Sequence, residues 1–465
     1  MSSLTSIPIE GVEFHSLSYE DSAGRLFWRD GHLYRGLSPS VAAFYEELFE
    51  SGVVDELVRD RLLVESRMTE YTMAEYPRIV EHSVVPFVSY AHEWCPEMLR
   101  SAGRLVLDLA ERLHSRGLEL RDSHVWNILF RGPHPLWVDF CAIGPASPDS
   151  AWWGTAGRFR EHFLNPLYLI SVGAGDIARM FQRTTFNGNV PSRHLTHFSV
   201  QKRLTQGLRA RAVNIAKRLP IPIQELLRER LNRHRSGGSV ASHFGSLREE
   251  LESIPLPQPE TLWSTYYDGC FPPFEPDSAW NGKQRRVFEL LTRIRPTTVI
   301  DMGSKRGWYA QLAARSGASV VAMDGDSACV SRLYADALAN SLPVLPLIMD
   351  VRDPSPARGL CGELCPAAWE RLICDLVLAL AMVHDLVLRS RLTFDQSVRL
   401  LKRFSKRYVL VEFVNAEDYM GKQLIRAEDS WYTSDNFQTT LRRHFRMVEH
   451  LPSDTDAREL YFCEL

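Results

Sequence analysis

Several features are scarce or absent in this chain of 465 residues. Lysine does not occur before Lys202, although arginine is present throughout. The eight cysteines are scattered; only Cys361 and Cys365 lie close together, and no second pair completes a zinc motif. The longest apolar run, 372–388, contains two aspartates and a histidine and is shorter than the roughly 20 apolar residues of a membrane helix. These absences predict free thiols, no metal centre and no membrane span.

The chain also has no excess of either charge. With 54 Lys and Arg against 57 Asp and Glu, its formal net charge is −3, which argues against a globally basic nucleic-acid binder. Hydrophobic residues make up 45% and charged residues 24%, ordinary values for a soluble globular protein. Residues 1–14 show neither the basic nor the apolar region of a signal peptide. We expect a cytoplasmic protein with about two or three domains.

Three stretches of the chain differ in character, and we expect them to be separate units: 1–190, 191–262 and 263–465. The first mixes short β-like runs with helical ones: a hairpin is predicted over 24–37, and amphipathic helices over 40–58 and 98–116. The second is a polar connector, with 10 Lys and Arg against 2 Glu over 202–235. In the third, strands and helices alternate, which is typical of a parallel α/β sheet.

The third stretch opens with a strand, a glycine turn and a helix. The strand, 297–300, runs into Asp301; the turn contains Gly303 and Gly307, and the helix begins near Trp308. The missing Cβ lets the backbone approach a ligand at Gly303 and allows close packing at the helix start at Gly307. Such a motif is weak alone, but its position between a strand and a helix is typical of a cofactor-binding turn.

The next strands also carry carboxylates. Strands over 318–323 and 344–349 are followed by Asp324 and Asp350, and a strand over 372–380 contains Asp375. Open α/β sheets bind ligands at the carboxyl ends of their strands, and an acid after the second strand accepts the ribose hydroxyls. The alternative is that Asp324 and Asp350 only cap helices. A nicotinamide dinucleotide is disfavoured, because Lys and Arg occupy the turn where a pyrophosphate needs a slim backbone.

This turn resembles motif I of the class I S-adenosylmethionine-dependent methyltransferases, which have a Rossmann-like sheet. The resemblance implies that S-adenosylmethionine is the cofactor. It further implies that the first acid and the glycines surround its methionine part, that the second acid binds the ribose and that the third lies near the adenine. The matching residues are Asp301, Gly303, Gly307, Asp324 and Asp350.

Several pieces of 263–465 further resemble a nodulation-protein-like subgroup of these methyltransferases, among them 409–413 and 460–464. The subgroup has paired histidines after the fourth strand, of which only His384 is present here. His384 is the expected general base, because imidazole takes up a proton near neutral pH; a structural role in the loop is the alternative. Glu412 is expected to line the acceptor pocket, unless it lies at the surface or caps a helix.

The first stretch contains a D-x-H-x-x-N sequence at Asp122, His124 and Asn127, and Asp139 begins a later D-F-C. These pieces resemble the catalytic loop and the D-F-G of aminoglycoside and choline phosphotransferases. The resemblance implies an α+β kinase-like domain in which Asp122 is catalytic and Asn127 and Asp139 bind the Mg²⁺ of Mg-ATP. Arg35 takes the place of the family's phosphate-binding lysine, and arginine is not a neutral replacement there. We therefore expect a degenerate domain that recognises a substrate, a nucleotide or a partner.

Together these patterns predict methyl transfer from S-adenosylmethionine to an O or N nucleophile of a small-molecule acceptor, such as a glycan or a natural-product intermediate. We expect no membrane or nucleic-acid partner. Three alternatives stay open. The first is a bifunctional small-molecule kinase–methyltransferase, and the second is a scaffold that binds neither cofactor. The third is an RNA-binding or RNA-modifying methyltransferase that uses Arg228, Arg230 and Arg233 of the basic connector.

Overall fold

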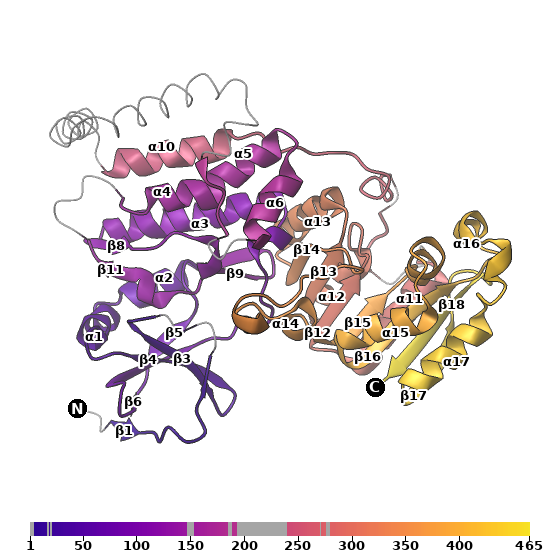
Figure 1. Ribbon diagram of the computed structural model, residues 1–465, viewed down its shortest axis with the longest axis horizontal. Helices are drawn as coiled ribbons and strands as arrows, with labels where there is room; N and C mark the ends of the chain where they lie inside the picture. Colours follow the sequence, from indigo (N-terminus) through magenta and orange to yellow (C-terminus); the bar gives the residue numbers. More distant parts are fainter. Residues whose placement is uncertain are drawn as a thin grey trace.

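The computed structural model describes residues 4–15, 18, 21–146, 153–184, 188–192, 240–269, 271–275 and 280–465. They form an N-terminal α+β domain and a C-terminal α/β domain that lie side by side (Figure 1). Within these ranges, every helix is too short or too polar to span a bilayer. The basic segment 202–235, with the arginines that the RNA-binding alternative invokes, lies outside the described residues.

The N-terminal domain has a small antiparallel sheet and a helical part. Its strands are β1 (Thr5–Ser6), β2 (Glu13–Phe14), β3 (Gly24–Arg29), β4 (His32–Leu37), β5 (Ser66–Met68), β6 (Tyr71–Thr72), β7 (Arg78–His82), β8 (Leu118–Leu120), β9 (Ile128–Arg131), β10 (His134–Trp137) and β11 (Ile143–Pro145). Its helices are α1 (Ala42–Glu50), α2 (Val53–Arg59), α3 (Pro96–His114), α4 (Ala156–Phe159), α5 (Asn165–Ser171), α6 (Gly175–Thr184) and α10 (Val240–Ser253). A five-stranded sheet in the order β2-β3-β4-β7-β5 stands next to the helices around α3, which is a kinase-like arrangement.

Local sequence explains most of these elements. β3 and β4 pair around Asp30 and Gly31, whose positive φ angles suit the tight turn of a hairpin, so the predicted hairpin is confirmed. The single helix predicted over 40–58 is wrong: α1 and α2 are separated by Gly52, which has a φ of 75°. The helix predicted over 98–116 is confirmed as α3, which begins at Pro96, a residue suited to a first helical turn.

Helix α10 packs against the N-terminal domain, although it belongs to the stretch expected as a connector. Leu251 lies against Gly103 of α3, and a Cβ on Gly103 would be 3.2 Å from it. Arg104 of α3 binds the carboxylate of Glu252, and Arg160 binds Glu250 through both terminal nitrogens. Residues 240–253 are therefore a packed part of the kinase-like domain.

The C-terminal domain is built on one seven-stranded sheet in the order β14-β13-β12-β15-β16-β18-β17. All neighbours pair in parallel except β18, which is antiparallel to both β16 and β17. The elements are α11 (Gly282–Ile294), β12 (Thr298–Met302), α12 (Trp308–Arg315), β13 (Ser319–Asp324), α13 (Ser327–Ala339), β14 (Val344–Ile348), α14 (Ala368–Arg371), β15 (Cys374–Ala379), α15 (Phe394–Arg403), β16 (Ser405–Val414), α16 (Tyr419–Leu424), α17 (Ser434–His444), β17 (Met447–Pro452) and β18 (Arg458–Glu464). The strands predicted before Asp301, Asp324 and Asp350 are confirmed as β12, β13 and β14.

Both faces of this sheet are covered, as parallel sheets require. Successive residues of a strand point to opposite faces, so Val299 packs with α11 and α12 while its neighbour Ile300 packs with α15 and α17. Most helices of this domain begin at polar caps; Asn281 and Gln284, for example, form a capping box at the start of α11. Because the strands β12 to β16 are parallel, their carboxyl ends lie at one edge of the sheet, together with the loops that follow them.

The two domains meet along the loop that follows β14. Arg371 donates to the carboxylate of Glu93 and, at 2.6 Å, to the backbone oxygen of Val88. The Ser355 hydroxyl donates to Glu93 at 2.6 Å, and His92 Nε2 lies 3.1 Å from that hydroxyl. The side chains of Arg371 and Glu93 are only 3% and 1% exposed. The contact is a buried polar network, not a loose surface contact.

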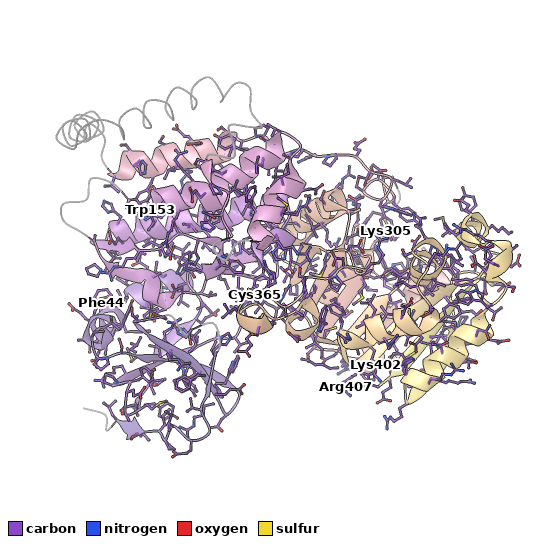
Figure 2. The ribbon with its side chains drawn as sticks, viewed as in Figure 1. Phe44, Trp153, Lys305, Cys365, Lys402 and Arg407 are labelled. Carbon is purple, nitrogen blue, oxygen red and sulfur yellow. The ribbon has the colours of Figure 1, made fainter. Side chains whose placement is uncertain are left out.

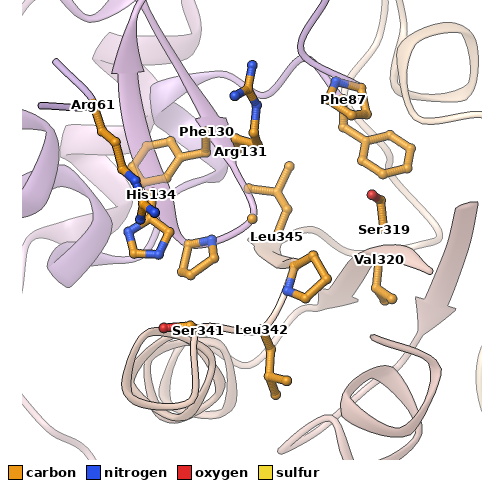
Figure 3. Close-up of a pocket in the computed structure, with 14 residues that line it drawn as sticks. Arg61, Phe87, Phe130, Arg131, His134, Ser319, Val320, Ser341, Leu342 and Leu345 are labelled. Atoms are coloured by element: carbon orange, nitrogen blue, oxygen red, sulfur yellow. The ribbon is translucent and has the colours of Figure 1, made fainter. Parts of the chain in front are cut away.

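A cavity of about 270 Å³ lies in the same junction (Figure 3). Arg61, Phe130 and His134 line it from the N-terminal domain, and Val320 and Leu342 line it from the C-terminal domain. Val320 is near the amino end of β13, so the cavity faces the edge opposite to the one where β13 ends. It is therefore distinct from the expected cofactor site.

Candidate functional site

Three residues of the turn between β12 and α12 have positive φ angles, which residues other than glycine rarely adopt. Gly303, Lys305 and Gly307 have φ angles of 68°, 52° and 69°. A Cβ on Gly307 would lie 2.6 Å from the Leu333 side chain, and one on Gly303 would lie 3.2 Å from Met382. Gly307 therefore permits close packing at the start of α12, as its position in the sequence predicts.

Asp301 is buried at this turn, and none of the described residues forms an ion pair with it. Its side chain is nearly fully buried, and Oδ2 has no hydrogen-bond partner among the described residues. Burial raises the pKa of Asp301 to about 7; the backbone N–H of Ala310 opposes this shift, and the charge of Asp324 adds to it. A cationic ligand group beside Asp301 would satisfy the orphaned oxygen, which fits the ammonium of an amino-acid tail.

Asp324 lies at the end of β13, beside the same turn. Its Oδ2 accepts the backbone N–H of Lys305 at 2.8 Å, and its Oδ1 accepts that of Asp326 at 2.8 Å. Burial raises the pKa of Asp324 although these two N–H groups act against it. Asp326, not Asp324, caps α13. Since a carboxylate has about four lone-pair sites, Asp324 keeps acceptor capacity for two ribose hydroxyls.

Two other carboxylates have different surroundings. Asp350 follows β14 and is half-exposed; its pKa is lowered by the hydrogen bond from Arg352, whose Nε lies 2.9 Å from Oδ1. Asp375 does not join the cofactor edge, and that expectation is wrong. It is the second residue of β15 and accepts the hydroxyl of Thr297 at 2.5 Å, at the amino end of the sheet. Because Asp375 lies early in β15, it is at the amino edge of the sheet and not at the edge of the glycine turn.

His384 and Glu412 are both buried near the end of the neighbouring strands. The Nδ1 atom of His384 has no partner among the described residues, and Nε2 lies 3.6 Å from Asp385. Burial lowers the pKa of His384, so the imidazole is neutral near neutral pH. Glu412 accepts from Lys283 Nζ at 3.0 Å and from the Ser453 hydroxyl at 2.7 Å. Both oxygens of Glu412 are therefore engaged, which suits positioning of Lys283 better than proton transfer.

Several residues of this edge were not found from the sequence. Lys305 places its ammonium 4.1 Å from the ring centre of Trp263 and 4.3 Å from that of Tyr266. Lys283 Nζ lies 5.7 Å from the ring centre of Tyr309. These aromatic residues cover the turn from the segment before α11 and from α12. No sequence signal placed them there, because each cation and its rings come from separate segments.

The kinase-like residues also converge. Asn127 Nδ2 donates to Asp139 Oδ2 at 3.3 Å, and a terminal nitrogen of Arg35 lies 3.8 Å from Asp139 Oδ1. Arg35 is buried and forms an ion pair with Asp21, from the loop before β3. Burial raises the pKa of Asp139 against the effect of Arg35. The charge of Arg35 is thus already matched by Asp21, a residue that the sequence did not single out.

Asp122 lies next to this group with partners of its own. Arg158 donates to Asp122 Oδ2 at 2.7 Å, and His124 Nε2 lies 3.2 Å from the same oxygen. Burial would raise the pKa of Asp122, but His124 and Arg158 outweigh it and lower the pKa to about 2. Asp122 is therefore ionised over the whole physiological range.

The strand order, the glycine turn and the two carboxylates beside it agree with the class of fold that the sequence predicts. The C-terminal domain has a Rossmann-like sheet like that of the class I S-adenosylmethionine-dependent methyltransferases, and the N-terminal domain has a kinase-like arrangement. In sequence the chain is similar to Nodulation protein NoeA of Rhizobium meliloti: the two are 24% identical over 490 aligned residues, which cover 96% of this chain and 95% of that protein. No protein-family model matches the chain.

Solved structures give weaker similarities. The bifunctional kinase-methyltransferase WbdD is 18% identical with a TM-score of 0.31, over 43% of this chain and 41% of WbdD. The magnesium protoporphyrin IX methyltransferase of Synechocystis, with bound SAH, is 10% identical with a TM-score of 0.28, over 41% of this chain and 90% of that protein. The match spans less than half of WbdD, and the fold assignment rests on the strand order, not on these scores.

Proposed function

We propose that the C-terminal domain transfers a methyl group from S-adenosylmethionine to an O or N nucleophile of a small-molecule acceptor, of the glycan or natural-product kind, in the cytoplasm. The observation that carries this proposal is the pair of buried carboxylates, Asp301 and Asp324, beside the glycine turn. When bound, the cofactor supplies a methyl group on a sulfonium that is open to in-line displacement. Such a reaction needs mainly alignment of the two reactants.

Each residue of this edge has a role in the proposal. Asp324 accepts hydrogen bonds from the ribose, and Gly303 lets the backbone approach the cofactor. Asp350 stands at the end of β14, where the adenine is expected. His384 accepts the proton of the nucleophile, which its neutral, buried imidazole supports. Glu412 holds Lys283 in the acceptor pocket.

We further propose that the kinase-like domain recognises the acceptor or a partner and does not transfer phosphate. The ion pair between Arg35 and Asp21 supports this, because a nucleotide phosphate would have to displace the partly exposed Asp21 carboxylate from the buried Arg35 guanidinium. A second candidate, a kinase–methyltransferase, is favoured by one observation: Asn127 and Asp139 still stand 3.3 Å apart, as a pair of Mg²⁺ ligands would.

Calorimetric titration of the full chain tests these proposals. We expect S-adenosylhomocysteine to bind the wild type, and Asp324→Asn, which keeps the shape of the side chain, to weaken binding at least about tenfold, since hydrogen bonds to charged groups contribute about 1.5–3 kcal/mol. Asp435→Asn, at an exposed position of α17, is the matched control and should bind like the wild type. Equal binding by Asp324→Asn, or no binding by the wild type, contradicts the methyltransferase proposal.

A parallel titration with MgATP separates the two roles of the N-terminal domain. No binding supports the recognition module. Binding that is lost in Asp139→Asn, together with turnover of ATP, contradicts it and establishes the kinase–methyltransferase. Transfer itself is followed with radiolabelled S-adenosylmethionine and a panel of hydroxyl and amine acceptors.

A further inference from the structure

The cavity between the two domains has charge of only one sign along its wall. Of the 14 residues that line it, three are basic and none is acidic. The basic residues are Arg61, Arg131 and His134, all from the N-terminal domain. Arg131 is already matched, because its guanidinium binds the carboxylate of Glu65 through both terminal nitrogens. Arg61 and His134 therefore remain as basic groups that no acid of the cavity wall neutralises.

Arg61 and His134 lie close together at one side of the cavity. In Figure 3 the side chain of Arg61 extends toward the imidazole of His134. Burial lowers the pKa of His134, and the charge of Arg61 adds to this shift, as expected of two neighbouring basic groups. The nearest carboxylate in the chain, Asp60, binds Arg112 at 2.6 Å instead. An anionic group between Arg61 and His134 would be attracted by the guanidinium and would accept an N–H from the imidazole.

The backbone at Arg61 is one that usually belongs to glycine. Arg61 follows the end of α2 with a φ of 58°, and the N–H groups of Arg61 and Leu62 bind the carbonyls of Val58 and Leu57. This is a Schellman ending, whose left-handed residue is most often glycine. A cation at the carboxyl end of a helix is favourable, but Arg59 in the last turn of α2 already supplies one. The helix ending alone therefore does not explain an arginine at position 61.

The remaining wall of the cavity is largely apolar and comes from both domains. Phe87 and Phe130 line it from the N-terminal domain, and Val320, Leu342 and Leu345 line it from the C-terminal domain. All five of these side chains are buried. The volume of about 270 Å³ corresponds to roughly nine water molecules at about 30 Å³ each. Because ordered water needs two to four polar partners, an apolar wall suits the body of an organic ligand better than water.

The two sides of the cavity meet in a direct backbone contact. A Cβ on Gly132, in the turn between β9 and β10, would lie 3.1 Å from the Cα of Pro343. The carbonyl of Pro343 accepts the N–H of Val320 at 2.9 Å, so this hairpin rests on the amino ends of β13 and β14. The glycine turn, marked by Lys305 in Figure 2, lies apart from the domain junction, where Cys365 is labelled. An occupant of the cavity would therefore contact both domains without reaching the proposed cofactor site.

We propose that this cavity is a binding site for a small organic anion, with a compact apolar body and one phosphate or carboxylate group. Arg61 and His134 bind the anionic group, and the buried apolar side chains hold the body between the domains. Arg61 is exposed, so the basic end of the cavity is open to an entering ligand. The site is additional to the proposed methyl transfer and does not depend on it. Because the occupant contacts both domains, its binding stabilises the folded junction.

Calorimetric titration of the full chain with three small aromatic probes tests this site. Phenyl phosphate and benzoate carry the two kinds of anionic group, and benzyl alcohol has a similar body without a charge. Arg61→Met removes the cation and Arg61→Lys keeps it, while Ser319→Phe places a ring in the cavity from the start of β13. Arg59→Met is the matched control, since Arg59 is an exposed arginine of the same helix that does not line the cavity. All titrations are made at one ionic strength.

We expect at least one of the two anions to bind the wild type about tenfold more tightly than benzyl alcohol. Arg61→Met should weaken binding of that anion about tenfold, and Arg61→Lys should recover most of the affinity. Ser319→Phe should abolish binding, and Arg59→Met should bind like the wild type. Whichever anion binds more tightly identifies the preferred anionic group.

Three results would overturn the proposal. The first is that neither anion binds the wild type more tightly than benzyl alcohol. The second is that Arg59→Met weakens binding as much as Arg61→Met, which would mean a general attraction to positive charge. The third is that Ser319→Phe folds and binds like the wild type, which would place the anion outside the cavity. If Ser319→Phe does not fold, the comparison of Arg61→Met with Arg59→Met decides. Binding of S-adenosylhomocysteine should be equal in Arg61→Met and the wild type, so a failure here is distinct from a failure of the proposed function.

Discussion

The ion pair between Arg371 and Glu93 allows a quantitative test of how the two domains are joined. Arg371→Met removes the cation but leaves a carboxylate that is 1% exposed inside the junction. Breaking a buried pair in this way costs about 3–5 kcal/mol. Ser355 and the backbone N–H of Tyr90 still donate to Glu93, so we expect the lower end, about 3 kcal/mol.

The corresponding change in melting temperature follows from the entropy of unfolding. At about 2.1 cal/mol/K per residue, the entropy of unfolding of a domain of about 200 residues is roughly 0.4 kcal/mol/K. A destabilisation of about 3 kcal/mol therefore lowers Tm by about 7 °C. Differential scanning calorimetry of the full chain measures this shift. The double variant Glu93→Gln, Arg371→Met removes the stranded charge as well and should melt several degrees above the single variant.

The pH dependence of the wild type provides an independent check. Burial raises the pKa of Glu93, but Arg371, His92 and Ser355 outweigh it and hold the pKa below its ordinary value of 4.5. A lowered carboxyl pKa contributes stability that is present above pH 4.5 and is lost as the pH falls through the folded-state pKa.

A Tm of Arg371→Met within 2 °C of the wild type, or a double variant no more stable than the single one, would refute the reasoning.

Two further predictions concern the glycine turn. Gly307→Ala should destabilise the protein by about 2–3 kcal/mol in thermal unfolding, because the new Cβ would meet the Leu333 side chain. Gly317→Ala is the control, since Gly317 also has a positive φ but has open space around it, and it should destabilise the protein clearly less. An equal loss of stability in the two variants would contradict the clash with Leu333. Because burial raises the pKa of Asp301 to about 7, its protonation between pH 8 and pH 6 should weaken S-adenosylhomocysteine binding up to about tenfold. Asp301→Asn should bind the ligand weakly, with an affinity that does not change over this pH range. A wild-type affinity that is independent of pH would contradict the role of Asp301.

The order of strands and helices could be predicted because it depends on local patterns. The hairpin around Asp30 and Gly31, and the strand–turn–helix around Asp301, are each specified by residues within one short segment. Helix breaks are harder: only Ser51 and Gly52 separate α1 from α2, and glycine within an amphipathic pattern is often tolerated. Asp375 lies at the amino edge because it is the second residue of β15, and its place in the first half of the predicted strand 372–380 already favours that edge.

The partners of the charges could not be predicted, since they come from distant segments. Glu412 looks like a free acid in the sequence, yet Lys283, 129 positions earlier, occupies one of its oxygens. Asp21, far from both kinase-like motifs, neutralises Arg35. Helix α10, in a stretch that looked like a linker, docks on α3 through its leucines and glutamates. Each contact depends on how segments pack, which hydrophobic periodicity does not specify.

By itself, the sequence determined the strand–turn–helix order of the C-terminal domain and the glycines of its turn, because backbone geometry restricts which residues such a turn tolerates. Only the tertiary structure decided which charges are paired and which remain open for a ligand. Coulomb energy depends on distance and burial, and both arise when chain segments hundreds of residues apart are packed together. For that reason the Asp301 oxygen that no described residue contacts, and the joint at Glu93 and Arg371, become visible only in the folded chain.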